Sequence, residues 1–184
     1  MLAGGKASRM GGQNKGLIKL AGKTLIEHVM DRLDPQLTNR FISANEAISE
    51  YESLGYPVVQ DVIPGQLGPL AGIYTTMQVA KKDWLLVVPC DVPLLPLDYA
   101  ERMLNHDGSV KAYVAFDGER QHSGCCLLHH SLQADLQQAL EQNHLAVHHF
   151  LTEHDAQQVD FSDHCQAFIN INTPEQLEAL EENV

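Results

Sequence analysis

Residues 2–15 constrain the fold of this chain more than any other segment, because they combine four glycines with three basic residues and contain no acidic residue. Glycine allows main-chain N–H groups to approach a ligand closely and to adopt positive φ angles. Arg9 and Lys15 supply positive charge for an anion. We therefore expect a phosphate-binding loop, of the kind that follows a buried strand in α/β proteins.

The charge distribution supports a compact anionic ligand at this end of the chain. The 184 residues carry a net charge of −12, yet residues 1–26 contain five basic residues and no acidic ones. One basic region on an otherwise acidic protein favours a polyanion such as a nucleoside triphosphate. Nucleic acids and membrane surfaces are themselves anionic, so the overall charge argues against either as a general partner. A soluble enzyme or a small-ligand binder is expected.

The length and the cysteines indicate one domain in a reducing compartment. A chain of 184 residues with 44% hydrophobic content is long enough for a single domain spanning residues 1–184. The four cysteines form no Cys-x-x-Cys pair, and no segment has the length of a membrane span or a signal peptide, so we expect a cytoplasmic protein. Only residues 1–3 precede the loop, which predicts a shortened central strand or missing apolar residues upstream of Met1.

Strand and helix patterns alternate along the chain. Strands are expected at residues 41–43, 58–59, 84–88, 112–116, 125–128 and 168–171. Helices are expected at residues 25–33, 46–54, 70–79, 97–104, 132–140 and 145–151 and after Pro174. Asp117-Gly118 is a two-residue hairpin signal, which adds an antiparallel element. The pattern predicts a three-layer α/β/α, Rossmann-like domain with a mostly parallel sheet and a ligand site at the carboxyl ends of its strands.

Polar residues stand at those expected strand ends. Asp91 follows the apolar strand 84–88 and is the candidate Mg²⁺ ligand, because a carboxylate there can share the ion with a triphosphate. Asn45 and Asp61 follow two other strands, and Asp61 would contact nucleotide or solvent. Lys15 would neutralise the phosphate under attack, and Arg9 would hold the departing phosphates.

A second phosphate-binding pattern fails on its spacing. Gly22-Lys23-Thr24 precedes a predicted helix, as in the P-loop of many nucleotide hydrolases, but that motif requires glycine where this chain has Leu17. Thr24 is better explained as the amino-terminal cap of the helix.

Several motifs together resemble one family. They are Leu2-Ala3-Gly4-Gly5-x-x-Ser8-Arg9-Met10-Gly11-Gly12-x-x-Lys15, Gly68-Pro69-Leu70-Ala71-Gly72, Pro89-Cys90-Asp91-x-Pro93 and Asn170-Ile171-Asn172-Thr173-Pro174. In this order, and over nearly the whole chain, they resemble the molybdenum cofactor guanylyltransferases. The resemblance implies a nucleotide-diphospho-sugar transferase-like fold and transfer of GMP from GTP to molybdenum-bound molybdopterin, with Mg²⁺ and release of pyrophosphate. It implies that GTP is bound by Leu2, Ala3, Gly4, Gly5, Lys15, Asn45, Asp61 and Asp91, with Asp91 also on the metal.

Two details of the loop bear on specificity and rate. The family commonly has Asp before the loop lysine, whereas this chain has Asn14, which removes a carboxylate beside Lys15. Leu-Ala-Gly-Gly resembles the guanylyl branch, since related cytidylyl enzymes usually show Leu-Ala-Ala-Gly. The alternatives are a cytidylyltransferase, a sugar-phosphate or alcohol-phosphate nucleotidyltransferase, and a non-catalytic GTP-binding cofactor carrier. Transient contacts with other cofactor-biosynthesis proteins or acceptor enzymes also belong to this hypothesis.

Overall fold

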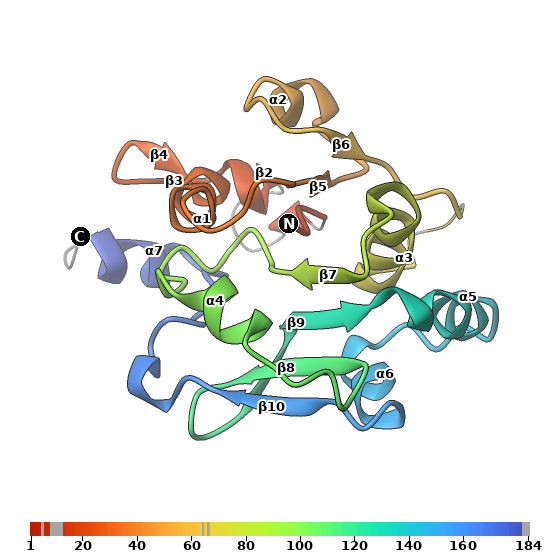
Figure 1. Cartoon of the computed structure of the whole chain (residues 1–184). Coiled ribbons are helices and arrows are strands. Elements are labelled where there is room, and N and C mark those ends of the chain that lie inside the picture. Colours follow the sequence, from red (N-terminus) through yellow and green to blue (C-terminus); the bar gives the residue numbers. More distant parts are fainter. Residues whose placement is uncertain (5, 8–12, 64, 66, 182–184) are drawn as a thin grey trace.

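A single mixed sheet organises the chain, whose computed structural model describes residues 1–4, 6–7, 13–63, 65 and 67–181. Across the sheet (Figure 1) lie β6 (Val58–Val59), β5 (Ile42–Ser43), residues 1–3, β7 (Trp84–Val87), β9 (Gln121–His129), β8 (Ala112–Phe116) and β10 (Gln157–Asp160). Within the described residues, β9 runs antiparallel to both neighbours, whereas β5 pairs with β6 and β8 with β10 in parallel. The predicted sheet, mostly parallel with an antiparallel element, is confirmed.

The amino-terminal residues form the centre of the parallel region. Leu2 N donates to Val88 O at 2.8 Å, and Ala3 N donates to Ser43 O at 2.8 Å. These bonds join the start of the chain to β7 on one side and to β5 on the other. The residues that follow Ala3 therefore leave the sheet at the carboxyl ends of the parallel strands, where the sequence predicts a ligand. β1 (Lys6–Ala7) and β2 (Gln13–Asn14) then pair antiparallel and bring the two ends of the loop together.

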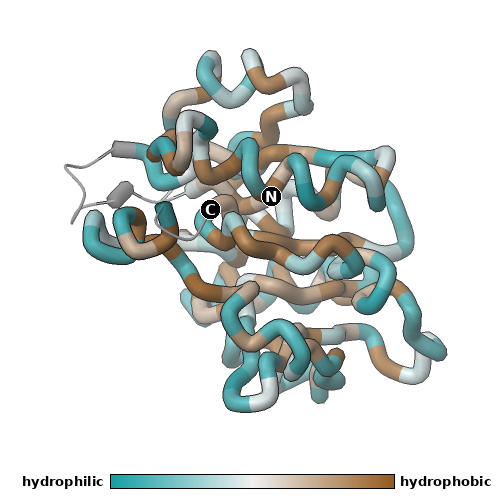
Figure 2. The backbone as a smooth tube through the Cα atoms, turned by 90° about the vertical axis from the view of Figure 1, so that its left-hand side faces the viewer, coloured by the Kyte–Doolittle hydropathy of each residue, from teal (hydrophilic) through white to brown (hydrophobic). Residues whose placement is uncertain are grey.

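Helices cover both faces of the sheet (Figure 1). α3 (Pro69–Ala80), α5 (Gln133–Glu141) and α6 (Val147–Glu153) pack on one face, and α1 (Leu25–Leu33) and α4 (Tyr99–Leu104) pack on the other. Along β9, Cys126 and Leu128 face the first group, whereas Cys125 and Leu127 face the second, because successive side chains of a strand point to opposite faces. Figure 2 shows hydrophobic strands inside and hydrophilic segments outside. The three-layer architecture is confirmed.

Helix α1 begins and ends where its sequence predicts. Thr24 Oγ1 accepts from Glu27 N, and the Glu27 carboxylate accepts from Thr24 N at 2.7 Å, which forms a capping box. The helix ends at Leu33, two residues before Pro35. Thr24 is thus a helix cap rather than part of a P-loop. The turn before it joins β3 (Lys19–Leu20) to β4 (Lys23–Thr24).

One predicted strand is wrong. Residues 168–171 form no strand, and the last strand of the sheet is β10, which the sequence patterns did not indicate. Phe168 is buried against the rings of Tyr99 and Phe161 instead of pairing its backbone in the sheet. The chain then runs to α7 (Pro174–Glu181), where Thr173 and Gln176 form the predicted capping contacts. Among the residues that the structure describes, the remaining short helices are η2 (Lys15–Leu17), η3 (His130–Leu132), η4 (Ser162–His164) and α2 (Ile48–Glu52).

Three of the four cysteines lie in the interior. Cys90, Cys125 and Cys126 are buried, whereas Cys165 is exposed after η4. Burial raises the pKa of the Cys126 thiol to about 12. The pKa of Cys90 is also raised to about 12, by burial first and then by the neighbouring Asp91 carboxylate. These thiols are therefore protonated at neutral pH and act as small apolar packing groups.

The hairpin between β8 and β9 is held by the side chain of Asp117. The sequence predicted a two-residue turn, but the loop spans residues 117–120, with Gly118 at φ 96°. Asp117 Oδ1 accepts from Glu119 N at 2.9 Å and from Arg120 N at 2.8 Å, and Oδ2 lies 2.6 Å from His122 Nε2. The carboxylate replaces hydrogen bonds that a tighter turn would make between backbone groups.

We expect Asp117 to make folding sensitive to acid. Burial raises the pKa of this carboxyl, but the Arg120 amide, the His122 ring and the Glu119 amide outweigh it and lower the pKa to about 2. Because the folded-state pKa lies below the unfolded value, the ionised group stabilises the fold above pH 4, and this contribution is lost as the pH falls towards 2. Urea unfolding of the wild type and Asp117→Asn should show a stability difference that shrinks by about 2 kcal/mol between pH 5 and pH 2.

Asp107 provides the matched control for this experiment. Its side chain also accepts from a backbone amide two residues ahead, that of Ser109 at 2.9 Å, but Asp107 is exposed to solvent. Asp107→Asn should change the acid dependence much less. A difference between wild type and Asp117→Asn that stays constant with pH would contradict the assignment.

Within the described residues, no helix is both long and apolar enough to cross a bilayer.

Candidate active site

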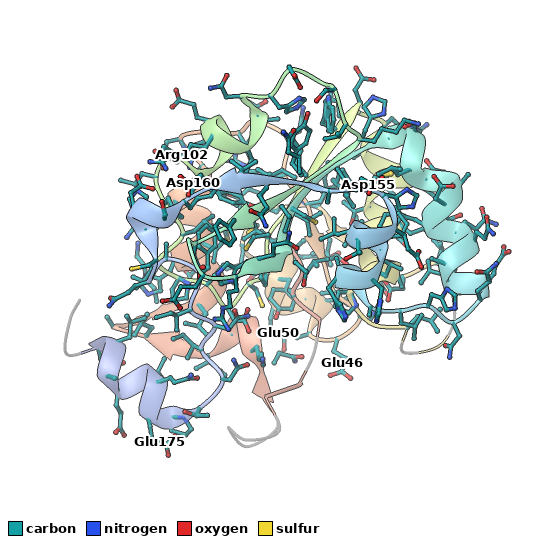
Figure 3. The ribbon with its side chains drawn as sticks, turned by 90° about the horizontal axis from the view of Figure 1, so that it is seen from below. Glu46, Glu50, Arg102, Asp155, Asp160 and Glu175 are labelled. Carbon is teal, nitrogen blue, oxygen red and sulfur yellow. The ribbon has the colours of Figure 1, made fainter. Side chains whose placement is uncertain are left out.

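A cleft of about 530 Å³ opens at the carboxyl ends of the central parallel strands. It is lined by Leu2, Ala3, Gly4, Asn14, Ser43, Asn45, Glu46, Asp61, Gly68, Pro69 and Gly72. Five residues predicted to bind nucleotide, namely Leu2, Ala3, Gly4, Asn45 and Asp61, therefore share one cavity. Glu46, another lining residue, is exposed, and its side chain points away from the ribbon (Figure 3). The volume lies within the range of small-molecule sites.

Asn45 and Asp61 act as one unit at the mouth of the cleft. Asn45 Nδ2 donates to Asp61 Oδ2 at 2.7 Å, and Asp61 N donates to Asn45 Oδ1 at 2.9 Å. The two residues follow the adjacent parallel strands β5 and β6, so the reciprocal bonds fix the ends of both strands together. Asn45 is exposed, and both residues contribute polar groups to the lining of the cleft.

Helix α3 begins at the cleft wall. Gly68 precedes it with φ 71°, a conformation that glycine adopts without strain, and Pro69 occupies the first helical position. Both residues line the cleft. The positive end of the helix dipole therefore lies beside the cavity, where it favours an anionic ligand.

Gly72 allows α3 to pack closely on the floor of the cleft. A Cβ atom at this position would lie 2.3 Å from Ser43 Oγ and 3.3 Å from Leu2 Cδ2. Both neighbours belong to the cavity lining. Glycine is thus required for the close approach of the helix to the strand.

We expect Gly72→Ala to lower the free energy of unfolding by about 1–3 kcal/mol, because the added methyl group would crowd the side chains of Ser43 and Leu2. Ser43→Ala removes the nearest atom, so the double variant Ser43→Ala/Gly72→Ala should recover part of that loss. Urea unfolding of both single variants and the double variant measures the coupling. A Gly72→Ala protein as stable as the wild type would contradict the close contact, as would a double variant with no recovery.

A cation and a carboxylate lie next to this cleft. Lys15 Nζ is 3.2 Å from Asp91 Oδ2, and Asn170 Nδ2 donates to Asp91 Oδ1 at 3.0 Å. Lys15 also donates to Asn172 Oδ1. Asp91 is only 4% exposed, so its charge depends on these donors. The pair does not itself line the cavity, but Lys15 directly follows the lining residue Asn14.

The sequence patterns identified part of this cluster. They placed Lys15 and Asp91 in one site, and the structure brings the two together. They assigned no role to Asn170 and Asn172, although both stand in a motif before the α7 cap. The spacing of two amides is a weak signal, and nothing local indicates contact with Asp91. Gly5 and Arg9, also predicted for the site, lie outside the described residues.

The chemistry of the cluster fits a magnesium ion that is shared with substrate. Mg²⁺ usually takes one or two protein carboxylates and completes its shell with water and phosphate oxygens. Among the residues that the structure describes, no group of three or more His, Cys, Asp or Glu side chains forms a closed metal cage. A single buried carboxylate, Asp91, beside a nucleotide-sized cleft matches the shared arrangement.

These features define an α/β protein whose ligand site lies at the carboxyl ends of its central parallel strands. Among solved structures, molybdopterin-guanine dinucleotide biosynthesis protein A from Archaeoglobus fulgidus superposes with a TM-score of 0.82 at 23% identity, covering 99% of this chain and 95% of that one. A CMP:2-keto-3-deoxy-manno-octonic acid synthetase complexed with CTP superposes at 0.73, with 14% identity, covering 100% and 95%. At these identities the likeness concerns the fold.

Sequence comparison identifies the family. The model of the MobA-like NTP transferase domain matches residues 1–159. The molybdenum cofactor guanylyltransferase of Shewanella woodyi is 46% identical over 186 aligned residues, covering 100% of this chain and 95% of the relative. That of Shewanella piezotolerans is 41% identical, covering 100% and 91%. This chain belongs to the MobA-like NTP transferase family, and it is a nucleotidyltransferase.

Proposed function

We propose that this enzyme transfers GMP from GTP to the terminal phosphate of molybdenum-bound molybdopterin, which forms the guanine dinucleotide cofactor and releases pyrophosphate. The observation that carries the proposal is the match along the entire chain to relatives named molybdenum cofactor guanylyltransferase. The cleft beside a buried carboxylate and a lysine supports it.

The cleft is proposed to bind the nucleotide. Leu2, Ala3, Gly4 and Gly5 would line it with backbone groups, because glycine lets a ligand approach the main chain. The Asn45–Asp61 unit would contact the nucleoside from the ends of the neighbouring strands β5 and β6. Guanine is proposed as the base because Leu-Ala-Gly-Gly resembles the guanylyl branch of the family.

The cluster beside the cleft is proposed to serve phosphoryl transfer. Lys15 would neutralise charge on the α-phosphate while the terminal phosphate of molybdopterin attacks it, and Arg9 would hold the departing pyrophosphate. Asp91 would hold Mg²⁺, which when bound neutralises phosphate charge. No protein nucleophile is required, because positioning two anions in line against their repulsion supplies the main effect. A cytoplasmic location and transient contacts with acceptor enzymes belong to the same proposal.

Pyrophosphate release tests the function directly. Incubation with GTP, Mg²⁺ and molybdenum-bound molybdopterin should yield pyrophosphate and guanine dinucleotide in equal amounts. Faster release with CTP than with GTP would assign the chain to the cytidylyl branch, and release with a sugar phosphate would indicate a different acceptor. Tight GTP binding without release, in the presence of the acceptor, would favour a cofactor carrier.

A further inference from the structure

The two oxygens of the Asp91 carboxylate are covered by donors of different kinds. Oδ1 accepts from the neutral amide of Asn170 at 3.0 Å, and Oδ2 faces the ammonium of Lys15 at 3.2 Å. The backbone carbonyl of Asp91 is held as well, since it accepts from Ile171 N at 3.0 Å. The carboxylate is therefore fixed on the Asn170 side, and Oδ2 is the oxygen whose partner is the ammonium of a long, partly exposed side chain.

Lys15 has a second acceptor close by. Its ammonium also donates to Asn172 Oδ1, and Asn172 Nδ2 donates to Asn170 O at 3.3 Å. That second bond orients the Asn172 amide so that its oxygen faces Lys15. The side chain of Lys15 is 24% exposed, whereas the side chain of Asp91 is almost fully buried. Lys15 can thus leave Asp91 while Asn172 keeps it beside the site.

We propose that Lys15 and Asp91 form a resting latch, in which the lysine ammonium occupies the carboxylate oxygen that a divalent cation needs and releases it only when nucleotide phosphate draws the ammonium away. In the resting state the pair is electrically neutral, so the buried carboxylate has no unbalanced charge to attract a divalent ion. A triphosphate offers the ammonium several anionic oxygens in place of one. The latch rests on the proposed function, and it makes divalent-ion binding dependent on nucleotide.

A purely structural ion pair, which only anchors residues 170–172 against the loop, is the competing explanation. It predicts that removal of Lys15 destabilises the protein without creating a metal site. The latch predicts that the same removal exposes a carboxylate oxygen to divalent cations. Binding of Mn²⁺ to the nucleotide-free protein separates the two, because it requires neither GTP nor turnover.

The experiment measures free Mn²⁺ by electron paramagnetic resonance during titration of nucleotide-free protein. We expect the wild type to bind Mn²⁺ weakly. Lys15→Met should bind Mn²⁺ at least about tenfold more tightly than the wild type, because that variant leaves the buried carboxylate without its cation. Lys15→Met/Asp91→Asn should lose the gain, and Lys15→Arg, which keeps the positive charge, should behave like the wild type. Lys15→Gln, which keeps a neutral donor, is the second variant if Lys15→Met fails to fold by circular dichroism.

Lys23 supplies the matched control. It pairs with Asp31 at 2.6 Å, but both side chains are 55% exposed, so Lys23→Met uncovers a hydrated carboxylate and should not tighten Mn²⁺ binding. The latch is overturned if folded Lys15→Met or Lys15→Gln binds Mn²⁺ no better than the wild type, or if the gain survives Asp91→Asn. Absence of pyrophosphate release from GTP would instead overturn the proposed function. It would not affect the Mn²⁺ titration, which uses nucleotide-free protein.

Discussion

Asp91→Asn is expected to lower pyrophosphate release at saturating GTP by about a thousandfold, because the variant loses the carboxylate charge that would hold Mg²⁺ against the phosphates. Asparagine keeps the shape of the side chain and one oxygen that can accept from Asn170. The fold should therefore persist, which circular dichroism checks. Asp91→Ala should have a similar effect on turnover, with a larger loss of stability, because it also removes the oxygen that accepts from Asn170 and leaves a cavity at a buried position.

Asp31→Asn is the control for this variant. Asp31 also pairs with a lysine, but on the exposed surface of α1 and away from the cleft, so turnover should be unchanged. Activity of Asp91→Asn within about tenfold of the wild type would show that this carboxylate is not the metal ligand.

Lys15→Met is expected to lower turnover by about a hundredfold, because the α-phosphate loses a cation that would offset its growing charge. Lys15→Arg should retain more activity, since it keeps the charge but changes its geometry. Lys15→Met should bind Mn²⁺ more tightly without nucleotide and yet turn over more slowly. A general loss of structure would lower both quantities, so the opposite signs distinguish a specific role from misfolding.

Lys23→Met serves again as the comparison, because it removes a surface lysine whose partner lies outside the cleft. Unchanged turnover in Lys15→Met would remove Lys15 from the reaction, whatever its effect on Mn²⁺.

Local signals in the sequence predicted the elements that frame the site. Thr24 marked the start of α1, and Gly68-Pro69 marked the loop that leads into α3, because capping and proline chemistry act over a few neighbouring residues. The strand pattern before Asp91 predicted its position, because the carboxyl ends of parallel strands meet at one edge of the sheet. The residue roles derived from these positions remain predictions.

The contacts that complete the site join distant parts of the chain. Asn170 meets Asp91 across 79 positions, and Asn172 meets Lys15 across 157, so no local pattern reports either contact. The same region misled the strand prediction. Its apolar residues indicate a strand, but Phe168 packs into an aromatic cluster while Ile169 is 41% exposed. Side-chain burial there takes the place of a strand, and Ile171 N makes a single backbone bond to Asp91 O.

The unequal burial of the cysteines has a practical consequence. Cys90, Cys125 and Cys126 are shielded and protonated, whereas Cys165 is accessible five residues before Asn170. A maleimide dye should therefore attach at a single native position without prior mutagenesis. Such a fluorophore would sit on the segment that leads to the two asparagines, where its emission can be followed during a titration with GTP.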